Sequence, residues 1–257
     1  MATYKKRGYK KPTPKVKGEK EEIFDGESTT KEVFETLDNT ASKAEDFVVK
    51  NQNVIFGIIA VVALAVLGYL GYERYIATPK HQEAMNEMFT AQQYFDQAVN
   101  GADKDSLYTL SLKGGEGKLG MIDIIDQYSG TDAANIASYY AGTAYLNLKD
   151  YENAIKYLSD FSSDDKMLGP IALGGIGDAF VQLNQPNEAL EYYEKAVNHN
   201  TNDYTTPMYL LKAANVAMTV EDNSKALNYL KRISDEFSKS TEASQVEVLI
   251  GKAEESL

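Results

Sequence analysis

The sequence predicts an all-α protein in which a single N-terminal transmembrane helix precedes an α-solenoid of helix-turn-helix repeats. Three observations lead to this prediction. Residues 51–72 contain no charged side chain, and residues 133–240 repeat one two-helix pattern at offsets of 35 and 37 residues. Apolar side chains recur at three- and four-residue steps through much of the remaining chain, the spacing of one helix face.

The N-terminal tail, residues 1–27, begins with a basic stretch. Residues 1–20 carry eight Lys or Arg residues, one Glu and few large aliphatic side chains. Such a segment buries too little apolar surface to fold alone, so we expect disorder. Three roles stay open for it: contact with anionic lipid, contact with the ribosome, and no contact beyond keeping this end in the cytoplasm.

Residues 28–50 are predicted to form an amphipathic helix next to the membrane. Thr29 and Glu32 have the spacing of a capping box at its start. Its polar face is acidic, which anionic headgroups repel, so a protein partner fits the apolar stripe better than a lipid surface does. A helix that frays in water is the alternative. The stripe consists of Val33, Leu37, Ala41, Ala44 and Val48.

Residues 51–75 are predicted to be the transmembrane helix. The 19 residues from Val54 to Tyr72 are almost wholly apolar. As a helix they would span about 28 Å, close to the ~30 Å hydrocarbon core of a bilayer. A buried core helix rarely stays apolar on every face for so long, and a cleaved signal peptide has a shorter apolar region nearer the chain start. We therefore expect an uncleaved anchor.

The distribution of charge predicts the orientation of the anchor. Lys and Arg are equally frequent in the short segments on either side of the span, but the fifty residues before it contain eleven of them. This bias predicts a cytoplasmic N-terminus. Residues 1–20 contribute +7 and residues 21–50 contribute −6 to the net charge of −12, so residues 73–257 carry −13. Such an acidic part argues against nucleic-acid binding, which depends on neutralising phosphates.

Residues 76–132 are predicted to be degenerate repeat-like helices. Thr78-Pro79 suits a helix start, and Gly101 suits its end. The stripe between them is predicted to be core, residues 103–117 are predicted to be loop-like, and a further helical face is closed by Gly130. The stripe is Met85, Met88, Phe89, Phe95 and Val99, and the further face is Leu119, Ile122, Ile125 and Tyr128.

The segment Gly114–Lys118 has the composition of a phosphate-binding loop but not its pattern. Leu112 stands where the first glycine of that motif belongs, Leu119 stands where Ser or Thr must follow the lysine, and no strand is predicted before it. Nucleotide binding is therefore not expected, and the role of this loop stays open.

Residues 133–240 are predicted to contain three repeats. Their aligned segments begin at Ala141, Ile176 and Ala213. Asp150 and Asp222 are predicted helix N-caps, while Pro186 and Pro207 are predicted to open helices. Residues 241–257 are predicted to be a capping helix that covers the last open face. The matched positions are Gly142, Gly177 and Ala214; Tyr145, Phe180 and Ala217; Ala154, Ala189 and Ala226; and Leu158, Tyr193 and Leu230.

This pattern resembles the tetratricopeptide repeat (TPR), a helix-turn-helix unit of about 34 residues with small, aromatic and alanine positions. The small residue lets the first helix of a unit (helix A) approach the second (helix B), and the aromatic residue is predicted to fill the gap between units. Ser138 and Ala217 depart from the pattern by replacing large residues, so the first and third units are predicted to pack less tightly.

The layout of an anchor followed by a short TPR array is similar to that of the bacterial membrane-anchored TPR family that serves as an ancillary subunit of the Sec translocon and meets periplasmic chaperones. The resemblance covers residues 45–257 and implies an inner-membrane protein with a periplasmic repeat domain. A TPR adaptor in another envelope or organellar membrane complex is the alternative.

The resemblance also implies a binding groove lined by helix-A side chains. No Lys or Arg stands at the aligned positions, which argues against a ligand held by its C-terminal carboxylate. An apolar floor with amide and hydroxyl rims suits an extended segment or a partner helix. The alternative is that Leu146, Val181 and Met218 pack inside the stack. The groove candidates are Tyr139, Thr143, Leu146, Asn147, Asp178, Val181, Gln182, Leu211, Asn215, Met218 and Thr219.

No motif predicts catalysis, a metal site or a cofactor. Cysteine and tryptophan are absent, and His81 and His199 are the two histidines. The missing thiols exclude disulfides, thiolate zinc sites and cysteine nucleophiles. The pairs Asp123/Asp126 and Asp164/Asp165 fit a solvated surface, and Asp103 with Asp105 lacks the glycine of a calcium loop. The prediction is a protein-binding scaffold rather than an enzyme, with an undetected enzyme as the remote alternative.

Overall fold

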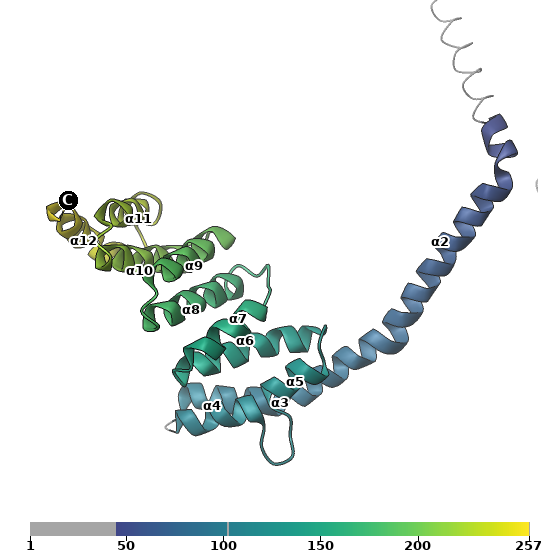
Figure 1. Cartoon of the computed structure of the whole chain (residues 1–257), viewed down its shortest axis with the longest axis horizontal. Helices are drawn as coiled ribbons and strands as arrows, with labels where there is room; N and C mark the ends of the chain where they lie inside the picture. Colours follow the sequence, from purple (N-terminus) through teal and green to yellow (C-terminus); the bar gives the residue numbers. More distant parts are fainter. Residues whose placement is uncertain (1–44, 102, 257) are drawn as a thin grey trace, which may run out of the picture. The chain divides into compact units, whose positions relative to one another are not determined.

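The computed structural model describes residues 45–101 and 103–256, and every regular element in them is a helix (Figure 1). The prediction of an all-α fold is confirmed. The chain divides into two units, residues 1–67 and 68–257, which are described separately. The predicted tail, and most of the predicted 28–50 helix, lie outside the described residues.

The first unit contains residues 45–50, which are helical, and most of helix α2, Gln52–Tyr72. The whole of α2 has no buried residue: Leu64 is 70 % exposed and Val61 is 67 % exposed. Within the described residues, one helix is long and apolar enough to cross a membrane, and none of its apolar window is buried.

The second unit begins with the last residues of α2, a π-helical turn at Glu73–Ala77, and helix α3 at Thr78–Asn100. Helix α3 starts at Thr78 with Pro79 in its first turn, as predicted, but the π-helical turn comes directly before it, so helical structure is continuous through this point. Proline has no N–H to donate, and the hydrogen bonds immediately before it are rearranged. The N–H of Thr78 reaches back to the carbonyl of Glu73, a bond across five residues.

Helix α3 packs against α4 (Lys104–Lys113), α5 (Met121–Gln127) and α6 (Asp132–Asn147). Two predictions for this region are wrong. Residues 104–113 are helical rather than loop-like, because Tyr108 and Leu112 pack against α3; the ring of Tyr108 meets that of Phe95 edge-on at 5.4 Å. The predicted core stripe of α3 is only half buried: Met88 and Phe95 are buried, whereas Met85, Phe89 and Val99 are exposed.

The predicted helical face over residues 119–128 is confirmed only in part: Leu119, Ile122, Ile125 and Tyr128 all pack against a core cluster, but Leu119 and Tyr128 lie outside α5. Helix α5 is shorter than that face, and it buries Met121 and Ile124, while Ile122 and Ile125 are half-buried. Gly130 lies three residues beyond the helix end, with a φ of 81°.

The repeats follow as three antiparallel helix pairs. The A helices are α6 (Asp132–Asn147), α8 (Leu168–Gln182) and α10 (Thr205–Thr219), and the B helices are α7 (Tyr151–Asp160), α9 (Pro186–His199) and α11 (Asn223–Glu236). The predicted N-caps are confirmed: the carboxylates of Asp150 and Asp222 accept from the backbone N–H groups of Asn153 and Lys225. Pro186 opens α9 as predicted, whereas α10 begins two residues before Pro207.

Each pair is joined by the same turn. The backbone N–H of Asp150 donates to the carbonyl of Tyr145, and that of Lys149 donates to Leu146. The same two bonds recur 35 residues later in the second pair and a further 37 residues later in the third, with Asn184 and Glu221 in place of Lys149. This is the Schellman motif, in which the residue after the helix is left-handed. Lys149, Asn184 and Glu221 have φ values of 61°, 58° and 62°, so glycine occupies none of these positions.

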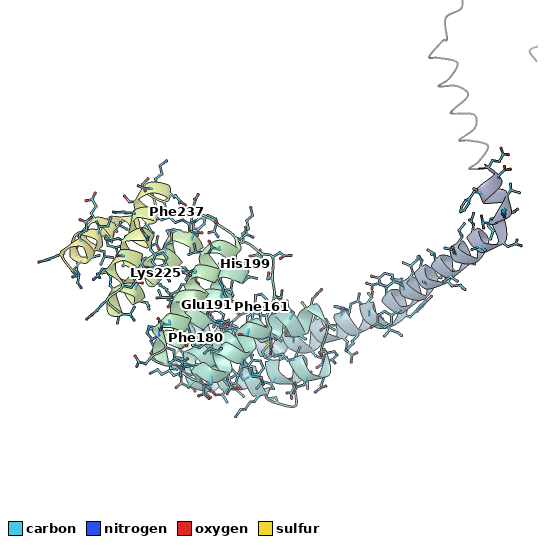
Figure 2. The ribbon with its side chains drawn as sticks, turned by 45° about the horizontal axis from the view of Figure 1, so that its top comes forward. Phe161, Phe180, Glu191, His199, Lys225 and Phe237 are labelled. Atoms are coloured by element: carbon cyan, nitrogen blue, oxygen red, sulfur yellow. The ribbon has the colours of Figure 1, made fainter. Side chains whose placement is uncertain are left out.

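The prediction that the repeat aromatics fill gaps between units is incomplete. Tyr145 stacks on Tyr157 at 5.5 Å, and Phe180 contacts Tyr192 at 5.4 Å, so both rings join the A and B helices of one unit. Figure 2 labels Phe180 among the side chains of the stack. Between units, Tyr209 on α10 lies against Gly174 on α8, where a β-carbon would meet its ring. Glycine is therefore required at Gly174 for adjacent A helices to approach.

The last helix, α12 (Ala243–Glu255), packs against α11 and buries Val246 and Ala253. Its outer face is polar, apart from Val248. The buried residues of the second unit form three apolar clusters along the stack rather than one central core, as adjacent repeats bury surface only against their neighbours.

Candidate functional site

A hollow of about 500 Å³ lies beside the first two repeats, and it is called the first hollow here. It brings together five of the predicted groove residues from α6 and α8, joined by three residues from the turn, from α7 and from α9. Asn147 and Gln182 are exposed, and Val181 is 38 % exposed. The lining residues are Leu146, Asn147, Lys149, Tyr151, Asp178, Val181, Gln182 and Tyr193.

The floor of the first hollow is organised by Asp178. The hydroxyl of Tyr193 donates to one carboxylate oxygen at 2.7 Å, and the Nζ of Lys212 donates to both oxygens at 2.7 Å. Burial, followed by the charge of Asp178, raises the pKa of Tyr193, so its hydroxyl keeps its proton and remains a donor at neutral pH. This cluster joins α8, α9 and α10.

The alignment of the repeats did not identify Lys212, because no Lys or Arg stands at the aligned groove positions. Lys212 follows Leu211 directly, and its Nζ lies 5.5 Å from the ring centre of Tyr209. The Nζ of Lys212 makes its two short contacts with the carboxylate oxygens of Asp178, so this ion pair neutralises the charge of Lys212 within the chain. Lys149 adds an exposed cation at the rim of the first hollow.

A second hollow, about 730 Å³, lies beside α10 and α12. It brings together the predicted residues Asn215, Met218 and Thr219. Asn215 and Thr219 are exposed, while Met218 is half-buried and packs on the core of the last repeats. The other lining residues are Glu221, Asn223, Leu249, Lys252 and Ser256.

Three of the predicted groove residues line neither of these hollows. Tyr139 is half-buried, with its ring 5.2 Å from that of Phe161 and 6.0 Å from that of Tyr140. Leu211 packs against the core of the last repeats, and Thr143 is half-buried. Leu146 also packs against a core cluster, so the apolar members of the set take part in the stack as well as in the hollows.

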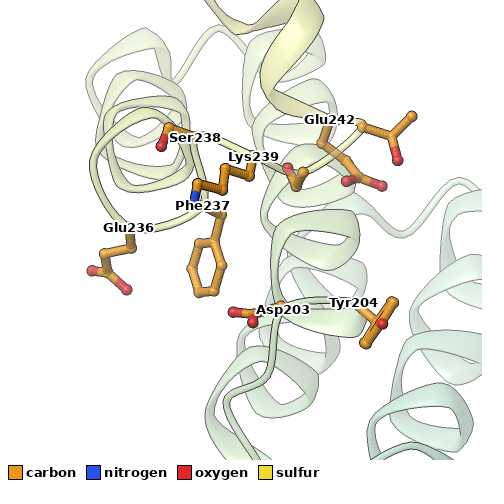
Figure 3. Close-up of a pocket in the computed structure, with 9 residues that line it drawn as sticks. Asp203, Tyr204, Glu236, Phe237, Ser238, Lys239 and Glu242 are labelled. Atoms are coloured by element: carbon orange, nitrogen blue, oxygen red, sulfur yellow. The ribbon is translucent and has the colours of Figure 1, made fainter.

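A third hollow, about 610 Å³, was not predicted (Figure 3). It lies between the turn that precedes α10 and the loop that joins α11 to α12. Figure 3 shows the ring of Phe237 pointing into it between Glu236 and Asp203. Asp203, Glu236 and Glu242 outnumber the one cation, Lys239, and Tyr204 is 76 % exposed. The periodicity of apolar residues could not predict this hollow, because it is formed by two loops that are far apart in the sequence.

The histidines have structural contacts. The Nε2 of His199 lies 2.8 Å from the carbonyl of Ser163, which fixes the end of α9 to the loop before α8. The Nδ1 of His81 accepts from the backbone N–H of Asp132 at 3.4 Å, which links α3 to the start of α6. In residues 45–101 and 103–256, no group of three or more His, Asp or Glu side chains is placed to hold a metal ion.

Comparison with protein families matches two of the three helix pairs. A tetratricopeptide-repeat model matches residues 137–164, which cover most of α6 and α7, and another matches residues 171–202, which cover most of α8 and α9. The chain contains tetratricopeptide repeats. The α10–α11 pair has the same turn as these two TPR units, and the N-cap Asp222 of α11 matches Asp150 of the first unit. A search of curated protein sequences found no match to the chain.

TPR units imply a scaffold for protein–protein interaction, and proteins built from them are typically not enzymes. The first and second hollows suit this class of function. Both combine exposed amide groups with half-buried apolar side chains, which can hydrogen-bond an extended backbone and hold an apolar side chain.

Proposed function

We propose that this chain is a membrane-tethered TPR scaffold that binds protein partners through the first and second hollows, and that it is not an enzyme. The observation that carries the proposal is the set of A-helix side chains left accessible at these hollows: Asn147, Val181 and Gln182 in one, Asn215 and Thr219 in the other. The amide and hydroxyl side chains of this set stand beside apolar surface, and the Oε1 of Gln182 accepts from the hydroxyl of Tyr151 at 3.4 Å.

The membrane tether is inferred from α2. Apart from Ile55, every large apolar side chain from Val54 to Leu70 is at least half exposed, an arrangement that is costly in water and favourable in lipid. The charge bias of the preceding residues favours a cytoplasmic N-terminus and a periplasmic repeat domain at a bacterial inner membrane. Anchoring confines the array near other membrane proteins and raises its effective concentration there.

Within this setting, the chain serves as an ancillary subunit or chaperone-linked component of the protein-translocation machinery. The layout of a single anchor and a short TPR array supports this role. A TPR adaptor in another envelope or organellar complex shares that layout, and the identity of the recovered partners separates the two.

The test compares two double variants of the full-length protein, purified from gently solubilised membranes, with bound proteins quantified by mass spectrometry. Asn147→Ala with Gln182→Ala removes two exposed amides from the first hollow. Asn86→Ala with Gln97→Ala removes the same two residue types from the exposed surface of α3. We expect the first variant to lose specific partners several-fold and the second to retain them.

Equal recovery of the same partners from both variants would refute the binding surface. Recovery of translocation components supports the specific role, whereas recovery of a different envelope complex supports the adaptor alternative. Tyr139→Ala is a poor probe, because the loss of its contact with Phe161 would disturb the stack itself.

A further inference from the structure

The first and second hollows are lined by the same positions of the repeat. Four lining residues of the first hollow have counterparts in the second hollow 72 residues further along the chain, which is the sum of the two repeat offsets. These positions are the end of an A helix, the turn after it and the start of the B helix. The two hollows are therefore one structural position, repeated two units apart. The corresponding pairs are Leu146 and Met218, Asn147 and Thr219, Lys149 and Glu221, and Tyr151 and Asn223.

The charge at the turn is reversed between the two hollows. Lys149 lines the first hollow, and its counterpart Glu221 lines the second; both side chains are exposed. Their φ values are 61° and 62°, so the two side chains leave the same turn from the same backbone conformation. Among the residues that the structure describes, neither side chain takes part in an ion pair. Each charge is therefore available to a bound segment.

The other charged residues of the hollows do not remove this difference. In the first hollow the second charge belongs to Asp178, which the ion pair with Lys212 neutralises. In the second hollow Lys252 on α12 stands 74 residues after Asp178, at the equivalent helix position, and it is exposed. The first hollow therefore offers a positive charge at the turn, whereas the second offers a negative charge at the turn and a positive one on the facing helix.

We propose that the first hollow selects an extended segment with an acidic side chain beside the turn, and that the second hollow selects a segment with a basic side chain there. This inference rests on the proposed function, because it assigns a charge preference to the same two hollows. A charge at the edge of a contact attracts the opposite charge and repels its own, so it discriminates between segments more than it adds affinity. Lys149 and Glu221 are the specificity-determining residues, and the two hollows bind different segments.

A phage-displayed library of random short peptides is the probe that tests this preference. Peptides are selected on the full-length protein in mild detergent and sorted by the hollow on which they depend. The first group loses binding to Asn147→Ala with Gln182→Ala, and the second group loses binding to Asn215→Ala with Thr219→Ala. We expect the first group to be enriched in Asp and Glu and the second group to contain Lys or Arg.

Reversing each turn charge tests the two residues directly. Lys149→Glu should weaken the binding of the first group several-fold and leave the second group unchanged, and Glu221→Lys should do the opposite. Each variant places at one turn the residue type that the other turn already holds in the same conformation. The unchanged binding of the other group also reports that the variant is folded.

The remaining outcomes separate this inference from the function on which it rests. Two groups with the same charge composition, or charge reversals that leave their own group unaffected, would refute the charge preference and leave binding at the hollows intact. A reversal that weakens both groups equally would show an effect of net charge rather than a contact at the turn, and would also overturn the inference. If no selected peptide depends on either double variant, the proposed binding surface itself is refuted.

Discussion

Gly177 on α8 and Tyr193 on α9 are in contact at the centre of the middle repeat. A β-carbon at Gly177 would lie 2.6 Å from Cε1 of Tyr193, so no larger residue fits without movement of the ring. The equivalent pair of the first repeat is Gly142 and Leu158, where the β-carbon would lie 2.5 Å from Cγ. The small position of the first two units therefore receives the large side chain that aligns fourth in the repeat.

This contact predicts that Gly177→Ala destabilises the repeat array. The ring of Tyr193 is held by its hydrogen bond to Asp178 and cannot move freely, so overpacking should lower the free energy of unfolding by ~1–3 kcal/mol. Urea unfolding of the full-length protein in mild detergent, followed by circular dichroism, measures the change.

Gly251→Ala is the matched control. Gly251 is helical and exposed on α12, with no atom within 4 Å of a built β-carbon. Alanine should stabilise the helix there by ~0.5–1 kcal/mol, because glycine has the greater backbone entropy in the unfolded chain. The assigned contact is wrong if the two variants shift stability in the same direction.

The left-handed turn residues predict a stabilising change. Glu221 has a φ of 62°, a conformation that costs L-residues about 1–2 kcal/mol, while glycine adds a smaller entropy cost. Glu221→Gly should therefore raise the free energy of unfolding by ~0.5–1 kcal/mol. Asn184→Gly, at a φ of 58°, should have little effect because asparagine tolerates this region. Equal effects in denaturant titrations would contradict the backbone explanation.

Glu194 predicts a loss of stability in acid. Burial alone would raise its pKa, but hydrogen bonds from Tyr229 and from Lys225, whose Nζ lies 2.9 Å away, together hold the pKa below its ordinary value of 4.5. A group with a lowered pKa in the folded state contributes stability above 4.5, and this contribution disappears as the pH falls through the lowered value.

The variant Glu194→Gln tests this directly. Its deficit in unfolding free energy relative to the unsubstituted chain should be largest near pH 7 and should shrink below about pH 4.5. Glu191→Gln, which removes an exposed ion pair with Lys195, should have a much smaller effect at every pH. A deficit at Glu194 that is independent of pH would show that charge is not the cause.

The proposed orientation predicts which side of the membrane each end of the chain occupies. In intact cells, Ser240→Cys should react with a membrane-impermeant thiol reagent added outside the cytoplasmic membrane. Ser28→Cys should react only after the membrane is permeabilised. The reverse pattern would invert the orientation, and labelling of both without permeabilisation would refute a spanning anchor.

Local sequence information determined the helical class, the repeat register and the N-caps. The caps at Asp150 and Asp222 and the helix start at Pro186 depend on groups only a few residues apart, so their residue types specify them. The small position at Gly177 could be identified because the same spacing recurs in each unit.

Only the tertiary structure decided which helix faces are covered and which distant groups meet. Periodicity placed Met85, Met88 and Phe89 in one stripe, but the positions of α4, α5 and α6 bury Met88 and leave the other two exposed. Periodicity also could not predict the contact of Lys212 with Asp178, 34 residues away, or the third hollow, which Phe237 helps to line. Such contacts depend on how helices pack across the turns between them, and the spacing of residues within one helix has no information on that packing.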